Sequence, residues 1–278
     1  MSQATNATQR YTINIDQDGK RAIDWLAEHT PISRMQLKKA LNNGAVWLKQ
    51  GKKQERMRRA TRELPQGCVL ELHYNAEVMA QVAQPLTVID HQKSYTVFFK
   101  PAGVLSQGSP EGDHMSALRI AEQQTNRKTY LIHRLDREAS GLLIIAHSEK
   151  AAALLSQMFQ NREIEKRYLV AVKGEWQPEL PLVLDSDLDG KHAVTVIEQA
   201  RFDAGNDQTY LRLAIETGRQ HQIRRHLADA GHPVIGDWRY GERLTGESLK
   251  LQAFELEYLC PLANRLRRYS VPPELALN

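Results

Sequence analysis

The sequence predicts an α+β protein with a small N-terminal α/β domain and a larger domain, which has a largely antiparallel mixed sheet flanked by helices. Gly141–Ala146 is a continuous apolar run, typical of a strand that is buried on both faces. Leu211, Leu213 and Ile215 alternate with other side chains, which indicates a strand with one core face. A helical spacing of apolar residues follows Ser148. Strands mixed with helices in this way indicate the α+β class.

The N-terminal part predicts two short helices and two strands. Apolar residues at helical spacing between 21 and 29 predict the first helix, which Thr30-Pro31 ends. Ser33 is a suitable N-cap for a second helix that ends at Asn42-Asn43-Gly44, where the glycine permits a left-handed turn. Strands are expected over 45–48 and 69–72.

The larger part predicts strands and helices in alternation, with breaks at glycine and proline. In chain order these are a strand over 95–99, the strand over 141–146, the helix after Ser148, a short strand opened by Lys166-Arg167-Tyr168, the strand over 210–215 and a helix over His221–Ala230. We therefore expect an N-terminal domain over 11–75, a linker over 76–93 and a second domain over 94–278.

Composition excludes several classes of protein. Hydrophobic residues make up 41% of the 278 residues, enough for a folded protein. No apolar run approaches the roughly 18 residues of a membrane span, so we expect no membrane association. The N-terminus is polar and does not resemble a secretory signal. Cys68 and Cys260 lie far apart in sequence, which argues against a disulfide scaffold and favours a cytoplasmic location.

Positive charge is concentrated in one segment. Residues 49–62 carry seven Lys or Arg against one Glu, whereas the whole chain has a net charge of only +4. Such a patch attracts phosphate backbones, although a solvated surface explains it equally well from charge alone.

The strongest candidate for chemistry is His133-Arg134-Leu135-Asp136-Arg137, which leads into the predicted strand at Gly141. A carboxylate between two arginines is stabilised in its charged form, and a position at a strand end holds it in place. Taken alone, the motif is more typical of a surface ion pair than of a catalytic site. His221 and His226 would face different directions on a helix, and no Cys or carboxylate completes a set, so we expect no metal site.

Further motifs resemble known families. The N-terminal part resembles the S4 RNA-binding domain over about 55 residues. The matching segments are Arg21–Ala27, Ser33-Arg34, Asn42–Val46 and Gly67–Leu70. A second set of motifs resembles, in order, those of the RluA family of pseudouridine synthases. These are Lys100-Pro101-Ala102-Gly103, the Asp136 motif, Lys166-Arg167-Tyr168, Thr217–Leu227 and Gly231–Gly241.

This second resemblance implies a pseudouridine synthase catalytic domain and assigns roles to its residues. Asp136 matches the catalytic aspartate, and Tyr168 matches the tyrosine that packs on the uracil ring. Arg219 matches the arginine that pairs with the aspartate, and Arg134 matches a contact to RNA around the displaced base. Ala139 departs from the threonine that is usual in the family.

The expected partner is RNA, ribosomal rather than transfer RNA, and the protein is expected to act as a monomer without a cofactor. The residues expected to bind RNA are Arg34, Lys52, Lys53, Arg56, Arg58, Arg59, Arg62 and Arg224. The alternative function is a catalytically weak RNA-binding or ribosome-assembly factor on the same fold. Sequence also leaves open whether Asp136 acts as a nucleophile or as a base.

Overall fold

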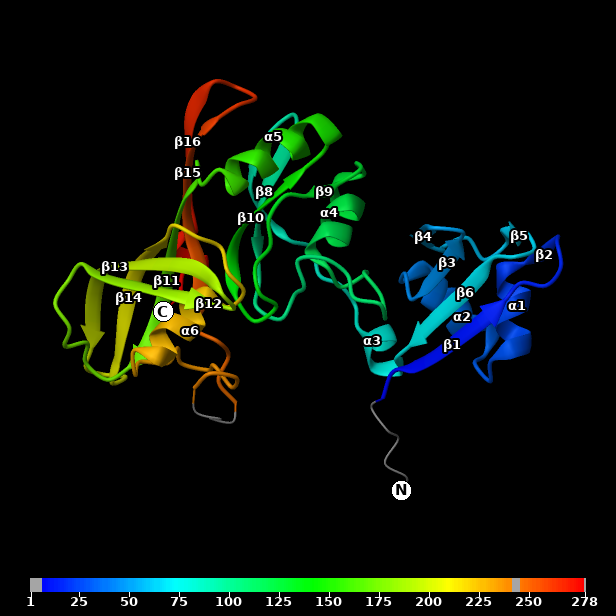
Figure 1. The fold of residues 1–278 in the computed structure, drawn as a ribbon, viewed down its shortest axis with the longest axis horizontal. Helices are drawn as coiled ribbons and strands as arrows, with labels where there is room; N and C mark the ends of the chain where they lie inside the picture. The colour runs from blue at the N-terminus through cyan, green and yellow to red at the C-terminus, as the bar shows by residue number, and fades with distance from the viewer. Residues whose placement is uncertain (1–6, 242–245, 278) are drawn as a thin grey trace. The chain divides into compact units, whose positions relative to one another are not determined.

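The computed structural model describes residues 7–241 and 246–277, so part of the polar N-terminal stretch lies outside the described residues. The chain forms two compact units (Figure 1). The first contains the residues up to Pro85 together with 107–120, and the second contains 86–106 and the chain from Ala121 onward. In the described residues, no helix is long and apolar enough to cross a membrane.

The first unit has a four-stranded antiparallel sheet in the order β1-β6-β3-β4. Its elements are β1 (Gln9–Asn14), β2 (Lys20–Arg21), α1 (Ala22–His29), α2 (Arg34–Asn42), β3 (Val46–Gln50), β4 (Lys53–Arg56), β5 (Glu63–Leu64), β6 (Val69–Tyr74) and α3 (Ala76–Ala80). Ser33 caps α2 in a reciprocal capping box with Gln36, as its sequence position predicts. Leu26, Leu37 and Leu41 pack with the strands in one apolar core.

The segment 107–120 joins the first unit although it comes after β8 in sequence. Trp47 donates its indole N–H to the carbonyl of Pro110, Arg56 donates to the carbonyl of Ser109, and Arg58 forms an ion pair with Asp113. The expected linker over 76–93 instead contains α3 and strand β7 (Thr87–His91), which pairs with β8. The unit boundaries therefore differ from the predicted 75 and 94, because long-range contacts of 107–120 have no local signal in sequence.

The second unit is built on a ten-stranded sheet with the order β12-β13-β14-β11-β15-β10-β8-β7, to which β16 adds beside β15 and β9 beside β10. Its further elements are β8 (Tyr95–Lys100), β9 (Tyr130–Leu131), β10 (Ser140–Ala146), α5 (Glu149–Gln160), β11 (Glu165–Lys173), β12 (Leu182–Leu188), β13 (Lys191–Asp203), β14 (Gln208–Ile215), α6 (Gln222–Asp229), β15 (Leu251–Cys260), β16 (Arg265–Ser270) and a short 3-10 helix over Pro273–Leu275. The unit boundary passes through α4 (Ala117–Thr125). Only the β10–β15 pair is parallel among the described strands, so the predicted mixed, largely antiparallel sheet is confirmed.

Helices cover the sheet in two places (Figure 1). Helix α5 packs against β10, where Leu155 and Met158 join Leu142 and Ile144 in one core cluster. Helix α6 packs against β12 and β13, where it contributes Ile223 and Leu227 to a second cluster. Strand β10 is buried on both faces, as its continuous apolar run predicts.

One local expectation is wrong. His221 was expected inside a helix, but it has a left-handed backbone with φ of 53° and precedes α6. Ile215 packs against the core cluster of Leu211 and Leu213, as expected, but it is only half-buried and also lines a cavity. Both residues lie where β14 ends, and a turn there redirects the chain toward α6.

Candidate active site

Asp136 lies on the loop between β9 and β10, and three contacts hold that loop. The buried ammonium of Lys100 donates to the carbonyl oxygens of Ala139 at 2.6 Å and Arg137 at 3.3 Å. Ser106 Oγ donates to the carbonyl of Leu135 and accepts from its N–H. Burial lowers the pKa of Lys100 to about 8, against the opposing charge of Asp136. The Lys-Pro-x-Gly motif therefore organises the loop from its backbone side.

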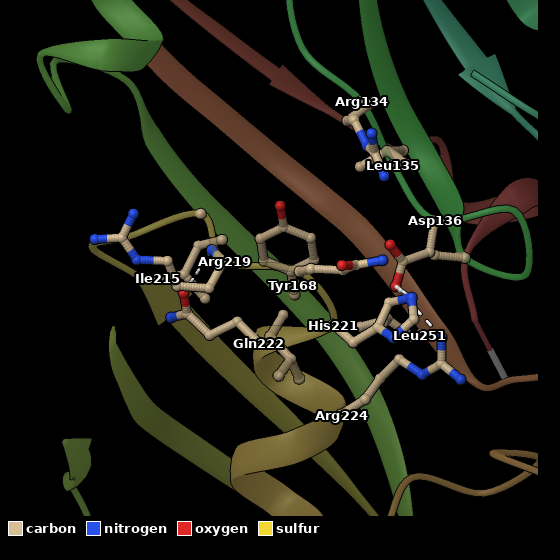
Figure 2. A pocket seen from close by; sticks show the side chains of 14 residues that line it. Arg134, Leu135, Asp136, Tyr168, Ile215, Arg219, His221, Gln222, Arg224 and Leu251 are labelled. Atoms are coloured by element: carbon tan, nitrogen blue, oxygen red, sulfur yellow. Dashed lines mark hydrogen bonds and ion pairs between the residues drawn. The ribbon is translucent and has the colours of Figure 1, made fainter. Parts of the chain in front are cut away.

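A cavity of about 400 Å³ opens beside Asp136. Its polar and aromatic lining comes from Arg134, Asp136, Tyr168, Arg219, His221 and Arg224, with Leu251 and Ile215 among the apolar side chains (Figure 2). Strands β14, β11 and β15 contribute Ile215, Tyr168 and Leu251, and they are consecutive neighbours in the sheet, with β10 next to β15. Asp136, just before β10, and Arg219, just after β14, therefore line the same cavity as Tyr168.

Tyr168 lies between Asp136 and Arg219 in the view of Figure 2. The pairing of β11 with β15 shifts register between Arg167 and Tyr168, a bulge of the kind that redirects a side chain. Burial, and then the charge of Asp136, raise the pKa of Tyr168, so its phenol stays protonated at neutral pH. A neutral ring in this position offers an apolar face to a planar base.

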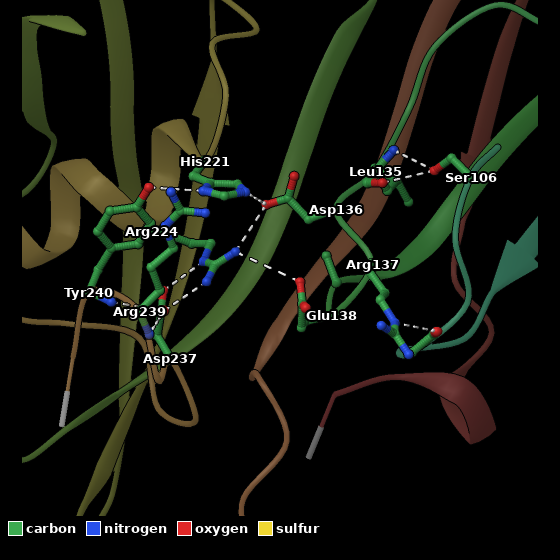
Figure 3. Close-up of polar contacts among 12 residues, drawn as sticks. Ser106, Leu135, Asp136, Arg137, Glu138, His221, Arg224, Asp237, Arg239 and Tyr240 are labelled. Atoms are coloured by element: carbon green, nitrogen blue, oxygen red, sulfur yellow. Dashed lines mark hydrogen bonds and ion pairs between the residues drawn. The ribbon is translucent and has the colours of Figure 1, made fainter. Parts of the chain in front are cut away.

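Arg224 holds Asp136, whereas the resemblance assigned this role to Arg219. Arg224 Nη1 donates to Asp136 Oδ2 in a long hydrogen bond of 3.4 Å and lies 3.9 Å from Glu138 Oε2 (Figure 3). Its other nitrogens make a two-pronged pair with Asp237, at 2.6 and 2.8 Å. The side chain is only 2% exposed and is paired with carboxylates, so this geometry favours a role in holding Asp136 over the expected role of Arg224 in RNA binding.

Asp237 holds Arg224 on the side away from Asp136. Its carboxylate also accepts the backbone N–H groups of Arg239 and Tyr240. Burial opposes the charge of Asp237, but Arg224 and these N–H groups outweigh it and hold its pKa below the usual value. The buried pair thus gives Arg224 one orientation, with Nη1 toward the loop that carries Asp136.

Arg219 points away from Asp136. Its Nε donates to the backbone carbonyl of His192 at 3.0 Å, and among the described residues it makes no ion pair with Asp136. The turn that carries it is secured by Gln222, whose Oε1 accepts from the Arg219 N–H and the Thr217 hydroxyl. Arg219 and the exposed Arg134 therefore belong to the cavity rim, with their guanidinium groups available to a ligand.

His221 is a site residue that sequence did not assign. Its Nε2 lies 3.8 Å from Asp136 Oδ2, and its Nδ1 is hydrogen-bonded to the Tyr240 hydroxyl at 2.9 Å (Figure 3). Burial lowers the pKa of His221 below 6.5 against the charge of Asp136, so the ring is neutral at neutral pH.

The sequence did contain a signal for the burial of Arg224. This residue lies three positions before the apolar Leu227 and shares the buried face of a helix with it.

The residues of the basic segment separate into two groups. Most are engaged within the first unit: Lys53 and Arg62 pair with Glu55, Arg58 pairs with Asp113, and Arg56 lies over the Trp47 ring at 4.1 Å. Arg34 likewise pairs with Asp24. Lys52 and Arg59 are exposed and, within the described chain, have no ion pair. Arg56 is thus a structural residue rather than the free RNA contact that was expected.

The site can hold a planar ring beside a carboxylate and anionic groups at its rim. Within residues 7–241 and 246–277, three or more His, Cys, Asp or Glu side chains do not gather at a metal-binding distance. Asp136 is partly open to the cavity, with 21% of its side chain exposed. Its carboxylate can therefore reach a ligand while Arg224 and His221 hold it from the other side.

Comparison with known proteins gives the same assignment. The family described as RNA pseudouridylate synthase matches residues 94–229. A dual-specificity RNA pseudouridine synthase RluA from Vibrio parahaemolyticus is 32% identical over 193 residues, which cover 62% of this chain and 77% of the relative. Ribosomal large subunit pseudouridine synthase C from Pasteurella multocida is 26% identical over 306 residues, covering 97% of this chain and 92% of the relative.

A solved structure shows the same fold. Human RNA pseudouridylate synthase domain containing 1 matches with a TM-score of 0.57 at 23% identity, over 69% of this chain and 84% of that one. The sequence relatives, the motifs around Asp136 and this fold agree. The chain belongs to the RluA family of RNA pseudouridine synthases, enzymes that isomerise uridine to pseudouridine in RNA.

Proposed function

We propose that the protein isomerises uridine in ribosomal RNA as a cytoplasmic monomer, with Asp136 acting on the sugar of a flipped-out nucleotide. The observation that carries this assignment is the cavity in which Asp136, Tyr168 and the Arg224–Asp237 pair converge. The relative that matches along 97% of this chain is named as a large-subunit ribosomal enzyme, which favours ribosomal RNA. The two buried cysteines are free, which suits a reducing compartment.

The reaction rearranges bonds within one nucleotide. The N1–C1′ bond breaks, the uracil turns, and a C5–C1′ bond forms while C5 loses a proton and N1 gains one. Asp136 assists at C1′ as a nucleophile or removes a proton from the sugar as a base. Tyr168 stacks on the freed uracil while it turns. Flipping the nucleotide costs a few kcal/mol, which phosphate contacts at Arg134 and Arg219 offset.

Replacement of Asp136 tests the chemical assignment. We expect Asp136→Asn to lower the single-turnover rate by more than about a thousandfold, because the amide is neither nucleophile nor base. Affinity for RNA should stay within about threefold, since phosphate contacts dominate binding. The measurement is tritium release from large-subunit ribosomal RNA labelled at uridine C5.

Glu138→Gln is the matched control, because it neutralises another carboxylate of the same loop. Its rate should fall less than about tenfold, since a neutral amide there leaves Asp136 in place. Turnover by an Asp136→Asn protein that is free of deamidation would refute the assignment. The non-catalytic alternative predicts no tritium release from the unaltered protein.

We also propose that the first unit is S4-like and binds RNA through Lys52 and Arg59. Because these two cations are exposed and unpaired within the described chain, phosphate can reach them. Lys52→Gln combined with Arg59→Gln should reduce the slope of log affinity against log salt by about 1.5, at an unchanged saturated rate. Lys150→Gln, at an exposed position on α5, is the control and should leave the salt slope unchanged. An unchanged slope in the double variant would exclude Lys52 and Arg59 as RNA contacts.

A further inference from the structure

A second cavity of about 450 Å³ continues from the catalytic one in the same unit. Both are lined by Arg134, Tyr168, Ile215, Gly218 and Arg219. Beyond these shared residues the second cavity is lined mainly by His133, Phe159, Arg162 and Lys166. Its volume is that of a small-ligand site, and the reaction at Asp136 does not use it.

Lys166 is a largely buried residue that lines the second cavity, and its ammonium has no partner among the described residues. It is 9% exposed, and among the described residues it has neither an ion pair nor a hydrogen bond. Its neighbour Arg167 is bound by three carboxylates, from Glu165, Glu198 and Glu255. Burial, and then the nearby Arg162, lower the pKa of Lys166. Because Lys166 lines the cavity and its ammonium has no partner among the described residues, the ammonium is available to an anion that enters the cavity.

The charges around the cavity select an anion. Arg134, Arg162, Lys166 and Arg219 contribute four cationic groups, and Glu216, an exposed residue, is the carboxylate in its lining. The lysine and the two rim arginines that the cavities share therefore form a continuous path of positive charge. A chain of phosphates that passes the catalytic cavity would continue along this path.

An aromatic pair completes the lining. His133 and Phe159 are stacked with ring centroids 4.2 Å apart and planes inclined by 17°. His133 Nε2 accepts the backbone N–H of Ile144, and burial, then Lys166, lower the pKa of His133 to about 3. The ring is therefore neutral with its proton on Nδ1. A neutral heteroaromatic ring beside cations suits a nucleobase rather than a second phosphate.

We propose that this second cavity holds the nucleotide adjacent to the target uridine, with its phosphate on Lys166 and Arg162 and its base against the His133–Phe159 pair. The inference rests on the proposed function in RNA, because the neighbouring cavity must hold the uridine. Lys166 is a binding residue here and takes no part in bond rearrangement. The site would give the enzyme a contact to the sequence that flanks its target.

The test combines binding with stability. Lys166→Met replaces the ammonium by an apolar chain of similar length, and it should leave Tm without RNA within about 2 °C, because the ammonium makes no contact with the described residues. The same variant should bind fluorescent hexauridylate about tenfold more weakly, with a salt slope reduced by about 0.7. Lys166→Arg should keep the affinity and slope of the unaltered protein.

Lys150→Met on the exposed surface of α5 is the control and should change neither affinity nor slope. Wild-type affinity and slope in Lys166→Met would overturn the proposal. The proposal would also be overturned if Lys166→Met lowered Tm and Lys166→Arg did not restore binding, because Lys166 would then be a structural residue. These measurements are made in the Asp136→Asn background, so they remain decisive if isomerisation of ribosomal RNA is not found.

Discussion

Arg224 and Asp237 are the residues on which the position of Asp136 depends. The pair is buried and two-pronged, with Arg224 Nη1 left to reach Asp136 at 3.4 Å. Lysine has no planar fork, so it cannot hold Asp237 and Asp136 in the same way. The contact with Asp136 that the family resemblance gave to Arg219 is made in this structure by Arg224, five positions later in the chain.

We expect Arg224→Lys to lower the single-turnover rate at saturating RNA by about a hundredfold or more, because loss of a buried partner costs roughly 3–5 kcal/mol. Arg219→Ala should instead raise the RNA concentration at half-saturation, with a rate loss below about tenfold, because it lies at the cavity rim. Rates and half-saturation are measured for both by tritium release. The reverse ranking would return the pairing role to Arg219.

At the scale of elements, the catalytic loop depends on the contact between β10 and β15. This pair is parallel, and Gly141 lies opposite Ala253 at the start of β10, five residues after Asp136. Gly141 has φ of +124°, and a Cβ there would collide with the backbone of Ala253. Glycine is thus required both for its conformation and for the close approach of the two strands.

Replacement of this glycine tests the dependence of the loop on strand pairing. Gly141→Ala should destabilise the second unit by about 3 kcal/mol or more and displace Asp136, because backbone atoms cannot give way cheaply. Gly174→Ala, with φ of +74° and open space around it, should cost only about 1 kcal/mol. Chemical denaturation and the single-turnover rate are compared, and equal losses in the two variants would contradict this account.

At the scale of the whole molecule, buried histidines make stability depend on pH. His147 is 8% exposed, and its Nε2 is hydrogen-bonded to Thr96 Oγ1 at 2.8 Å. Burial, then Arg127 and His91, lower its pKa from 6.5 to about 4. Between these values the unfolded chain binds more protons than the folded protein. Stability is therefore full above pH 6.5 and is lost as pH falls through this window.

We expect the Tm of the unaltered protein to fall by roughly 3–5 °C per pH unit below 6.5 from His147 alone, which corresponds to roughly 1.4 kcal/mol per unit. His147→Gln should show a smaller fall between pH 6.5 and 5. His192→Gln changes an exposed histidine and should follow the unaltered protein. Calorimetry in matched buffers makes the comparison, and identical slopes for His147→Gln and the unaltered protein would exclude the effect.

The molecule also shows why its division differs from the predicted one. Residues 107–120 follow β8 in sequence but bond to the first unit through Arg56, Arg58 and Trp47. A boundary drawn from local composition near 75–93 cannot detect such contacts. These contacts engage Arg56 and Arg58, two of the cations that were expected to bind RNA. Charge density thus predicted where arginines gather but not which of them remain open to a ligand.

The sequence by itself determined the local elements and the family. Ser33 and Ser148 cap their helices, and the apolar run before His147 forms the buried strand, because these features depend on residues within a few positions. The motif around Asp136 and its companions in order likewise identified the family. Local conformation can therefore be predicted where the residues that determine it are close in sequence. The family can be predicted because its motifs occur in a fixed order.

Only the tertiary structure decided which side chains meet. Strand order in the sheet brings Asp136 next to Arg224 and His221, 88 and 85 positions later in the chain, and turns Arg219 toward His192. It also leaves Lys166 without a partner among the described residues, while Arg167 beside it has three. Pairing and burial depend on distances between remote segments, and a few tenths of an ångström or one bulge in β11 changes them.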